Sequence, residues 1–277
     1  MKRAIGVWVL SSLIAWGCAS DPKESTGPST GTSGTPAASA GTGGPAATSG
    51  SSAAGGPAGA GNANCAALPL TSNPDDVVAT FEEGTGAVLQ VGGRGGGFYM
   101  FNDSTGMQTP PPGMLPPAAP TNRCGSTYAL CMSGKNFMTW GAGMGTDFAP
   151  TTGGMGMGTK QTYDASVYKG VAFWAKSNGA GPISVRVGFK DKNTAPEGGQ
   201  CDANAKAGAE QCNDDWGKAV SFTPEWQPVK LSFAELTQSG WGKAFTAFEI
   251  KSVYSIQYQV SQGVDFDVCI DDLQFVR

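Results

Sequence analysis

The sequence predicts an all-β fold, a two-sheet β-sandwich of jelly-roll type, for most of this chain. Glycine and proline recur at short intervals, and both residues interrupt regular structure. No window repeats apolar residues at the i, i+3, i+4 spacing of an amphipathic helix. Several segments instead alternate apolar and polar residues, which is the period of a strand with one buried face. Strands joined by long irregular segments favour two packed sheets.

Five segments carry this strand pattern, and one short segment suits a helical turn. Val253-Tyr-Ser-Ile-Gln-Tyr-Gln-Val260 is typical, because its apolar residues fall at every second position. The helical turn is expected in Phe233–Ser239. The expected strands are residues 170–176, 183–189, 229–233, 253–260 and 266–275.

The N-terminus has the pattern of a bacterial lipoprotein signal. Met1-Lys2-Arg3 is basic, and residues 4–16 are apolar but too few to span a membrane. Residues 13–18, Leu-Ile-Ala-Trp-Gly-Cys, resemble a lipobox, with a small residue before Cys18 that fits cleavage. We therefore expect residues 1–17 to be removed as a signal peptide, and acyl chains on Cys18 to hold the protein at a membrane. A plain secretory signal is the alternative.

The residue after the expected anchor bears on the destination of the protein. Ala19, rather than an aspartate, follows Cys18. By resemblance to enteric lipoproteins, this favours export to the outer membrane. We expect a protein of the bacterial cell envelope that contacts the membrane through its lipid alone.

Residues 18–64 predict a disordered linker. They are nearly all Gly, Ser, Thr, Ala and Pro, and Asp21, Lys23 and Glu24 are their only charges. Such a segment cannot bury enough apolar surface to offset the entropy of ordering it. A flexible chain of about 45 residues reaches roughly 35–40 Å. The rest of the chain, residues 65–277, predicts a single β domain held away from the membrane.

Missing residue types exclude several kinds of chemistry. The chain has no histidine, which excludes histidine-based triads, histidine-ligated zinc and histidine general bases. Residues 92–97 are glycine-rich but lack the Lys-Ser/Thr ending of a phosphate-binding loop. Glycoside hydrolysis would need two carboxylates that face each other in a cleft. The acidic residues near the domain ends are better explained as a cation site, so we expect no catalysis.

The balance of charge excludes another class of partner. Without Lys2 and Arg3, the 18 basic residues become 16, and against 22 acidic residues this leaves a net charge of −6. A mildly acidic domain without a basic stripe is a poor candidate for binding nucleic acid or anionic lipid. We expect a monomer with no nucleic-acid partner.

Two acidic motifs mark the ends of the domain. Asp271 and Asp272 interrupt an otherwise apolar strand, and carboxylates in a buried strand are costly unless something compensates them. Glu82 and Glu83 form an acidic turn where the domain begins. The expected compensator is a hard cation with oxygen ligands, most often calcium. The alternative is a pair of solvated carboxylates at a strand end.

Six of the seven cysteines remain for pairing if Cys18 is lipidated. An even number in an oxidising compartment indicates disulfides. Cys201 and Cys212 flank a polar loop, and a bond between them would restrict the unfolded chain. We expect this pair to form.

The other four cysteines give a less direct prediction. Cys65 precedes the first strand and Cys269 lies in the last, where the ends of a jelly roll come together. A Cys65–Cys269 pair is therefore expected, and Cys124 and Cys131 would pair by elimination. Free buried thiols are the alternative for these four.

Strand alternation predicts a polar face that could hold a ligand. Arg186 lies opposite the apolar face of its strand, Gln257 and Gln259 do so on another strand, and Trp174 does so on a third. Sugars need this mixture, because their C–H faces stack on aromatic rings while their hydroxyls bond to planar polar groups. The alternative is an ordinary half-buried polar face with Trp174 covered by a loop.

Several motifs in order resemble one family. Residues 163–176, Tyr-Asp-Ala-Ser-Val-Tyr-Lys-Gly-Val-Ala-Phe-Trp-Ala-Lys, carry the clearest match. Together the motifs span nearly all of residues 75–277 and resemble family 11 carbohydrate-binding modules and bacterial surface lipoproteins with a galactose-binding-like fold. Phe98 stands where a tryptophan is usual. The other matching segments are residues 98–103, 140–143, 194–201, 212–217 and 236–242.

The resemblance implies a ligand set for calcium and a carbohydrate ligand on the concave sheet. It places a structural calcium on Glu82 and Asp272, with Glu83, Asp271 and Asp103 in reserve. Trp140, Trp226 and Trp241 are expected to pack in the core or in loops. The residues expected to contact carbohydrate are Trp174, Arg186, Gln257, Gln259, Tyr99, Asp191, Asp214 and Trp216.

Two functions from different classes follow from these observations. The first is a membrane-tethered module that binds polysaccharide or glycan without catalysis. The second is a surface structural or adhesion lipoprotein that uses the same fold for protein contacts. An open groove with ordered aromatic side chains would favour the first, and an exposed apolar patch elsewhere would favour the second.

Overall fold

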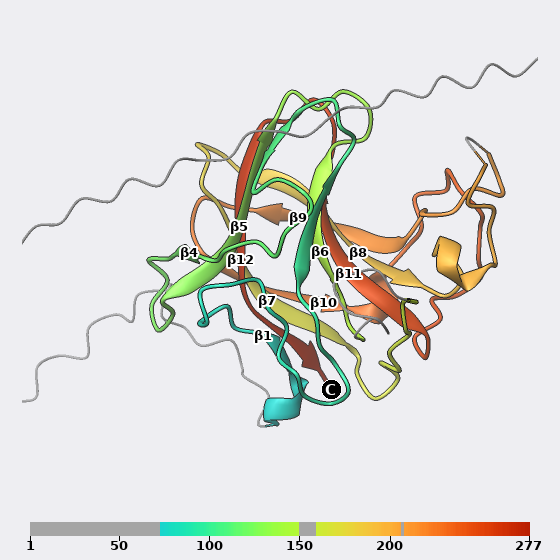
Figure 1. The fold of residues 1–277 in the computed structure, drawn as a ribbon, viewed down its shortest axis with the longest axis horizontal. Coiled ribbons are helices and arrows are strands. Elements are labelled where there is room, and N and C mark those ends of the chain that lie inside the picture. Colours follow the sequence, from blue (N-terminus) through green and yellow to red (C-terminus); the bar gives the residue numbers. More distant parts are fainter. Residues whose placement is uncertain (1–72, 150–158, 206–207) are drawn as a thin grey trace, which may run out of the picture. The chain divides into compact units, whose positions relative to one another are not determined.

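The computed structural model describes residues 73–149, 159–205 and 208–277 (Figure 1). The expected signal peptide, the lipidated Cys18 and the linker 18–64 lie outside these residues. The described chain forms two antiparallel sheets and three single-turn 3₁₀ helices, which confirms the all-β sandwich of jelly-roll type. No helix in this part of the chain is long and apolar enough to cross a membrane.

The first sheet has seven strands and the second sheet has five. The first sheet has the order β10 (Gln227–Ser232), β7 (Gly170–Ser177), β12 (Phe266–Val276), β5 (Tyr128–Lys135) and β3 (Met107–Thr109), with β1 (Val77–Ala79) beside β12 and β4 (Ala119–Pro120) beside β5. The second sheet has the order β2 (Phe98–Asn102), β6 (Ala142–Asp147), β11 (Val253–Val260), β8 (Ile183–Asp191) and β9 (Trp216–Phe222). The 3₁₀ helices are η2 (Pro74–Asp76), η3 (Pro196–Gly198) and η4 (Phe233–Glu235).

All five strands expected from alternation are present, as β7, β8, β10, β11 and β12. The expected helical turn is η4. It begins with a capping box, in which the Ser232 hydroxyl accepts the N–H of Ala234 at 3.3 Å and the Glu235 carboxylate accepts the N–H of Ser232 at 3.1 Å. Most of the strands that alternation missed are short or contain glycine; β6, for example, reads Ala-Gly-Met-Gly-Thr-Asp. Glycine has no side chain with which to mark a face.

The core lies between the two sheets and follows the predicted alternation. On β8 the inward residues Val185, Val187 and Phe189 are fully buried. On β11 the inward residues Ile256 and Tyr258 are also fully buried. Period-two patterning therefore assigned the inner and outer faces of these strands correctly.

Strand β7 contributes to this core from the opposite sheet. Val171, Phe173 and Ala175 pack into the main core, whereas Ala172 and Trp174 point to the far side of the first sheet. Because β7 pairs with β10 and β12 while β8 lies in the second sheet, the expectation that Trp174 shares a sheet face with Arg186 is wrong.

The disulfides confirm one expected pair and correct two others. Cys201 and Cys212 are bonded, as expected. Cys131 of β5 is bonded to Cys269 of β12, so neither Cys65–Cys269 nor Cys124–Cys131 forms. The physical reason is register, because β5 and β12 are neighbours and place the two cysteines directly opposite each other. Cys124 is disulfide-bonded as well.

Removal of the Cys131–Cys269 bond should destabilise the protein more than removal of Cys201–Cys212. The two bonds join residues separated by 138 and 11 positions, and the entropic contribution grows with the logarithm of loop length. We expect the double variant C131S/C269S to lose about 2 kcal/mol more unfolding free energy than C201S/C212S. Urea denaturation under non-reducing conditions measures both losses, and equal losses would contradict the loop-entropy explanation.

Candidate functional site

A row rich in glycine crosses the outer face of the second sheet. Three of its five members are glycines, so the backbone itself forms much of the floor. A ligand can approach peptide groups closely where no side chain stands above them. From β2 to β9, the register gives the row Tyr99, Gly145, Gln257, Gly188 and Gly217.

The glycines of this row differ in what a side chain would meet. A Cβ at Gly145 would lie 2.7 Å from the carbonyl oxygen of Ile256, and a Cβ at Gly217 would lie 2.8 Å from that of Val187. Close packing therefore requires glycine at these two positions. A Cβ at Gly188 would meet no atom closer than 3.8 Å. A Cβ at Gly188 would therefore make ordinary van der Waals contacts, so packing does not require glycine at this position.

The surface is hollowed beside this row, and the hollow has a volume of about 250 Å³. Trp140 and Trp241 stand at its edge, with 41% and 47% of their surfaces exposed. Half-exposed indoles next to polar groups are typical of surfaces that bind a partner with both apolar and polar parts. The hollow is also lined by Arg186, Gly188, Asn213, Asp214, Asp215, Ser239, Gln257, Gln259 and Ser261.

The indole of Trp140 is held in place from two sides. Its ring stacks on that of Phe101 from β2, with 6.0 Å between the centroids. Its backbone is fixed by Asp103, whose Oδ2 accepts the N–H groups of residues 139–141, each at 2.9 Å. Desolvation opposes ionisation of Asp103, but these bonds and those from Thr105 lower its pKa below the ordinary value. Asp103 therefore organises the loop that carries Trp140.

The loop that carries Trp241 is organised by Asp214 in the same way. The buried carboxylate of Asp214 accepts three backbone N–H groups from residues 239–242, at distances of 2.7 to 3.2 Å. The Gln238 amide adds a bond to the backbone carbonyl of Asp214 at 2.8 Å. These bonds satisfy a buried charge and leave the loop little freedom to move.

Charged groups at the side of the hollow are paired with the protein. Arg186 donates from Nη2 to the backbone carbonyls of Asp215 at 2.9 Å and Thr237 at 2.7 Å. The Lys190 amine donates to the Asn213 amide oxygen at 2.8 Å and lies 3.7 Å from Oδ2 of Asp215. Burial raises the pKa of Asp215 to about 6, although Lys190 opposes the shift. This side of the hollow therefore presents donors and acceptors in fixed positions, and its positive and negative side chains nearly balance in charge.

Two amides on β11 keep hydrogen-bonding capacity for a ligand. Gln257 donates to the Tyr99 hydroxyl at 3.2 Å, and Gln259 donates to the carbonyl of Trp140 at 3.1 Å. No group in the described residues donates to the oxygen of either amide. An amide oxygen can accept two hydrogen bonds, so both oxygens remain available on the floor of the hollow.

The structure brings together five of the eight residues predicted to contact carbohydrate. Arg186, Gln257, Gln259 and Asp214 line the hollow, and Tyr99 lies at the end of the row and contacts Gln257. That they contact a ligand stays a prediction.

Trp174 is not in this group. It is fully buried on the far side of the first sheet, and the guanidinium of Arg123 lies 5.3 Å from its ring centroid. The prediction of an exposed stacking surface at Trp174 is therefore wrong, because a loop residue covers the ring.

Asp191 and Trp216 do not line the hollow either. Asp191 is fully buried, and its carboxylate accepts the N–H of Thr194 at 2.9 Å and the N–H of Glu249 at 2.7 Å. Trp216 is 9% exposed and packs in the core near Phe248, with 6.5 Å between ring centroids. Asp191 supports a loop, and Trp216 contributes to the core.

Sequence reasoning missed the two exposed tryptophans. Trp140 and Trp241 were expected to pack in the core or in loops, and of the three tryptophans so assigned only Trp226 is buried. Trp140 and Trp241 both lie outside the five segments that alternate apolar and polar residues, but this signal is not specific, because the buried Trp216 also lies outside them.

The aspartates expected to bind calcium are paired with an arginine. Asp271 accepts a bond from Nε of Arg123 at 2.8 Å, and Asp272 accepts one from Nη2 at 2.5 Å. Arg123 and Asp271 are buried, and Asp272 retains 23% of its side-chain exposure. Burial raises the pKa of Asp271 to about 6, although the Arg123 guanidinium opposes the shift. The compensating cation in the structure is thus a side chain.

The acidic turn at the start of the domain contacts the same loop. The Glu82 carboxylate accepts the Ser126 hydroxyl at 2.8 Å and the Thr127 N–H at 3.0 Å, whereas Glu83 is exposed. No three His, Cys, Asp or Glu side chains of residues 73–149, 159–205 and 208–277 come close enough to hold a metal ion. As they stand, Glu82, Asp271 and Asp272 do not fit a calcium ligand set, because hydrogen-bond donors already occupy them. Calcium binding itself stays an untested prediction.

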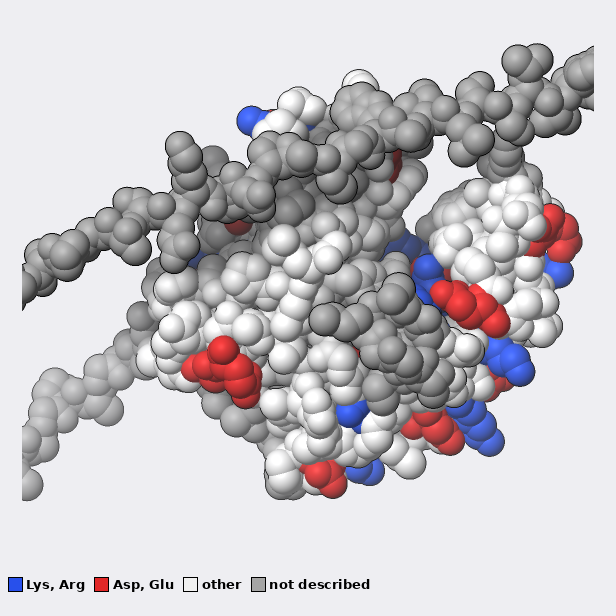
Figure 2. Space-filling model, viewed as in Figure 1, with Lys and Arg blue, Asp and Glu red and all other residues white. Residues whose placement is uncertain are grey.

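Charged side chains on the face drawn in Figure 2 form no continuous patch of one sign. Figure 2 shows Lys and Arg scattered among Asp and Glu on the face drawn, without a basic stripe.

Comparison with known proteins finds one family whose profile matches the chain, over residues 136–277, and its description is carbohydrate binding domain 30. No curated protein matches the chain.

One similar solved structure is a family 11 carbohydrate-binding module from Clostridium thermocellum, in complex with a β-1,3-1,4-mixed-linked tetrasaccharide. Its sequence is 11% identical to this chain, and the TM-score is 0.44. The match covers 73% of this chain and 94% of the module. A family 30 module of a Clostridium thermocellum cellulosomal cellulase is 18% identical, with a TM-score of 0.38 over 65% and 96%. An exo-β-agarase is 12% identical, with a TM-score of 0.42 over 72% of this chain and 25% of that one.

Loss of the Arg123 guanidinium should destabilise the protein strongly. The substitution Arg123→Gln leaves Asp271 and Asp272 without their cation, and breaking a buried ion pair costs about 3–5 kcal/mol. Urea denaturation at pH 7 measures the loss. The control Lys218→Gln breaks the exposed Lys218–Glu235 pair, which should change stability far less, because solvent screens an exposed pair. Equal effects of the two substitutions would contradict the assigned role of Arg123.

The wild type and the variant Asp272→Ala test the calcium prediction. Because Arg123 already neutralises both aspartates, we expect the melting curve of the wild type to be the same in calcium chloride and in a chelator. A melting temperature that rises with calcium and loses this rise in Asp272→Ala would support the calcium site instead.

Proposed function

Because this chain belongs to the carbohydrate binding domain 30 family, we propose that it binds polysaccharide or glycan in the hollow of the second sheet, without catalysis. The observation that carries the proposal is the pair of exposed indoles, Trp140 and Trp241, at the edge of a hollow with a polar floor. Family membership supports the class of ligand, and this geometry supports the proposed location.

The lining suits the surface of a sugar. An indole offers an apolar plane on which the C–H face of a pyranose can stack. The oxygens of Gln257 and Gln259 accept hydroxyl protons, and the guanidinium of Arg186 donates to hydroxyl oxygens. The bare backbone at Gly188 lets a ring sit close to the sheet. The site thus combines stacking planes with donors and acceptors, as sugar recognition requires.

A binding role also agrees with the state of the acidic groups near the hollow. The Asp214 carboxylate is occupied by three backbone N–H groups, and that of Asp215 lies against Lys190. Glycoside hydrolysis needs one carboxyl group that gives a proton and a second that attacks or activates water. Carboxylates that hold a loop and a lysine are unsuited to these tasks.

Protein adhesion is the second candidate. It is favoured by exposed apolar side chains away from the hollow, among them Met107, Met114 and Leu115, at 64%, 59% and 50% exposure. The carbohydrate role is favoured over it because, within the described residues, the tryptophans of the hollow remain uncovered.

The proposal includes a membrane anchor. The sequence pattern of residues 1–17 and Cys18 supports a lipoprotein of the cell envelope, in the outer membrane or at the cell surface, and residues 18–64 would serve as its linker. A single binding domain on a flexible linker could hold polysaccharide near the membrane without a fixed orientation.

Substitutions at the hollow should weaken or abolish carbohydrate binding without unfolding the domain. A glycan array identifies the ligand, and calorimetry then measures its affinity. We expect Trp140→Ala and Trp241→Ala each to weaken binding about tenfold, which corresponds to about 1.4 kcal/mol. Gly188→Leu should abolish binding with little change in melting temperature, because a Cβ there would meet no atom closer than 3.8 Å and the leucine side chain would occupy the hollow that Gly188 lines.

Met138→Ala is the matched control, because Met138 is 74% exposed near Trp140 but does not line the hollow. It should bind like the wild type. Failure to bind any glycan, or full binding by Gly188→Leu, would contradict the proposed function.

Replacement of Cys18 tests the anchor separately. In a bacterial host, Cys18→Ser should move the protein from the membrane fraction to the soluble fraction and remove labelling by radioactive palmitate, because the acyl chains have no attachment site. The control Cys201→Ser/Cys212→Ser alters cysteines that are already paired and should leave the fractionation unchanged. Membrane retention of Cys18→Ser would contradict the lipid anchor.

A further inference from the structure

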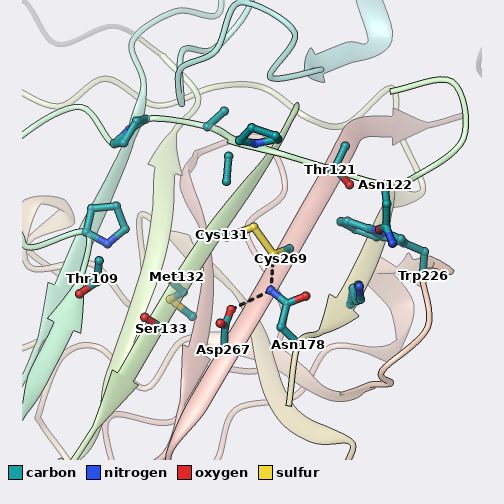
Figure 3. Close-up of a pocket in the computed structure, with 16 residues that line it drawn as sticks. Thr109, Thr121, Asn122, Cys131, Met132, Ser133, Asn178, Trp226, Asp267 and Cys269 are labelled. Carbon is teal, nitrogen blue, oxygen red and sulfur yellow. Dashed lines mark hydrogen bonds between the residues drawn. A yellow bond between two sulfur atoms is a disulfide. The ribbon is translucent and has the colours of Figure 1, made fainter. Parts of the chain in front are cut away.

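A second hollow, with a volume of about 540 Å³, lies on the outer face of the first sheet, away from the tryptophan-edged site (Figure 3). We propose that it is a second carbohydrate-binding site, which takes a neutral sugar unit or the end of a short oligosaccharide. Its volume falls in the range of small-molecule sites, about 300–1,000 Å³. The ligand class rests on the proposed function, whereas the location rests on different residues.

The floor of this hollow is rigid. It is formed by β5 and β12, whose strands are joined there by the Cys131–Cys269 disulfide. Ser133 and Asp267 lie opposite each other in the same pair of strands. The side walls come from the segment 117–122 and from Trp226. A preformed site loses little entropy when a ligand binds.

Side-chain amides at this site are oriented by hydrogen bonds. Figure 3 shows Nδ2 of Asn178 between Asp267, whose carboxylate it reaches at 2.9 Å, and the sulfur of Cys269 at 3.3 Å. On the other side, Oδ1 of Asn122 accepts the indole N–H of Trp226 at 3.3 Å. Both protons of the Asn178 amide are thus directed at protein atoms, and its oxygen is left to accept. Asn122 is left with its N–H₂ group to donate.

A lysine completes the polar set. Lys176 lines the hollow, and among the described residues it has no ion-pair or hydrogen-bond partner. Asp267 keeps a second carboxylate oxygen beyond the one that Asn178 uses. The hollow therefore presents unused donors on Lys176 and Asn122 and unused acceptors on Asn178 and Asp267. Vicinal hydroxyls, which donate and accept at once, match this arrangement.

Charge and apolar surface favour a neutral sugar over other small ligands. One lysine and one aspartate line the hollow, so an anionic ligand would meet Asp267 and a cationic ligand would meet Lys176. Proline side chains at 110, 117 and 120 and the disulfide supply apolar surface between the polar groups. Such alternation suits the C–H groups of a sugar ring, and two sites on different sheets would let one domain hold two glycan chains.

Two-dimensional NMR of the ¹⁵N-labelled protein tests this inference. Cellotetraose, xylotetraose and mannotetraose are added in turn as neutral probes. We expect at least one of them to shift the indole signal of Trp226 and the side-chain amide signals of Asn122 and Asn178. Ser133→Phe, which fills the hollow from an outward position on β5, should remove these shifts and leave those of Trp140 and Trp241 in place.

Lys176→Met serves as a second variant, because it keeps the apolar stem and removes the unpaired charge; it should weaken the Trp226 shifts at an unchanged melting temperature. In Gly188→Leu the Trp226 shifts should persist. Shifts at Trp140 and Trp241 alone would overturn this inference and leave the proposed function intact. Shifts at Trp226 alone would instead show that carbohydrate does not bind in the hollow of the second sheet, and would overturn that part of the proposed function. If no probe causes any shift, both the second site and the proposed function are overturned. If the Trp226 shifts persist in Ser133→Phe, the second site alone is overturned.

Discussion

The pairing of Arg123 with Asp271 and Asp272 determines much of what surrounds it. β12 lies at the centre of the first sheet, between β7 and β5, and its two carboxylates need a cation. The guanidinium supplies it and draws the loop of Arg123 across the outer face of that sheet. The same group covers Trp174. Arg123 therefore covers the part of this face at Trp174, and the part near the Cys131–Cys269 disulfide remains hollow.

Aspartates elsewhere act as organisers of loops. Asp103, Asp214 and Asp191 each accept backbone N–H groups from a loop that lacks regular structure. A carboxylate is well suited to this because it only accepts, and does so at several sites. Two of these loops carry the exposed tryptophans. Asp103 and Asp214 thus fix the positions of the two exposed indole planes.

The two sheets expose different kinds of surface. The second sheet has a floor opened by glycines, with aromatic planes on ordered loops at its edge. The first sheet has a floor closed by a disulfide, with amides held by their neighbours. Both combine apolar planes with fixed donors and acceptors. Family membership supports carbohydrate as the class of ligand, and the proposed sites on the two sheets differ in shape.

The sequence by itself determined the class of fold, the positions of the longest strands and which of their residues face inward. It also identified Arg186, Gln257 and Gln259 as neighbours on one face. Each of these features is local, because a period of two depends only on adjacent residues. Tertiary structure decided which sheet each strand joins, and so it separated Trp174 from Arg186 and paired Cys131 with Cys269. Strand partners are chosen by packing and register across the whole chain, and no short window of sequence contains that information.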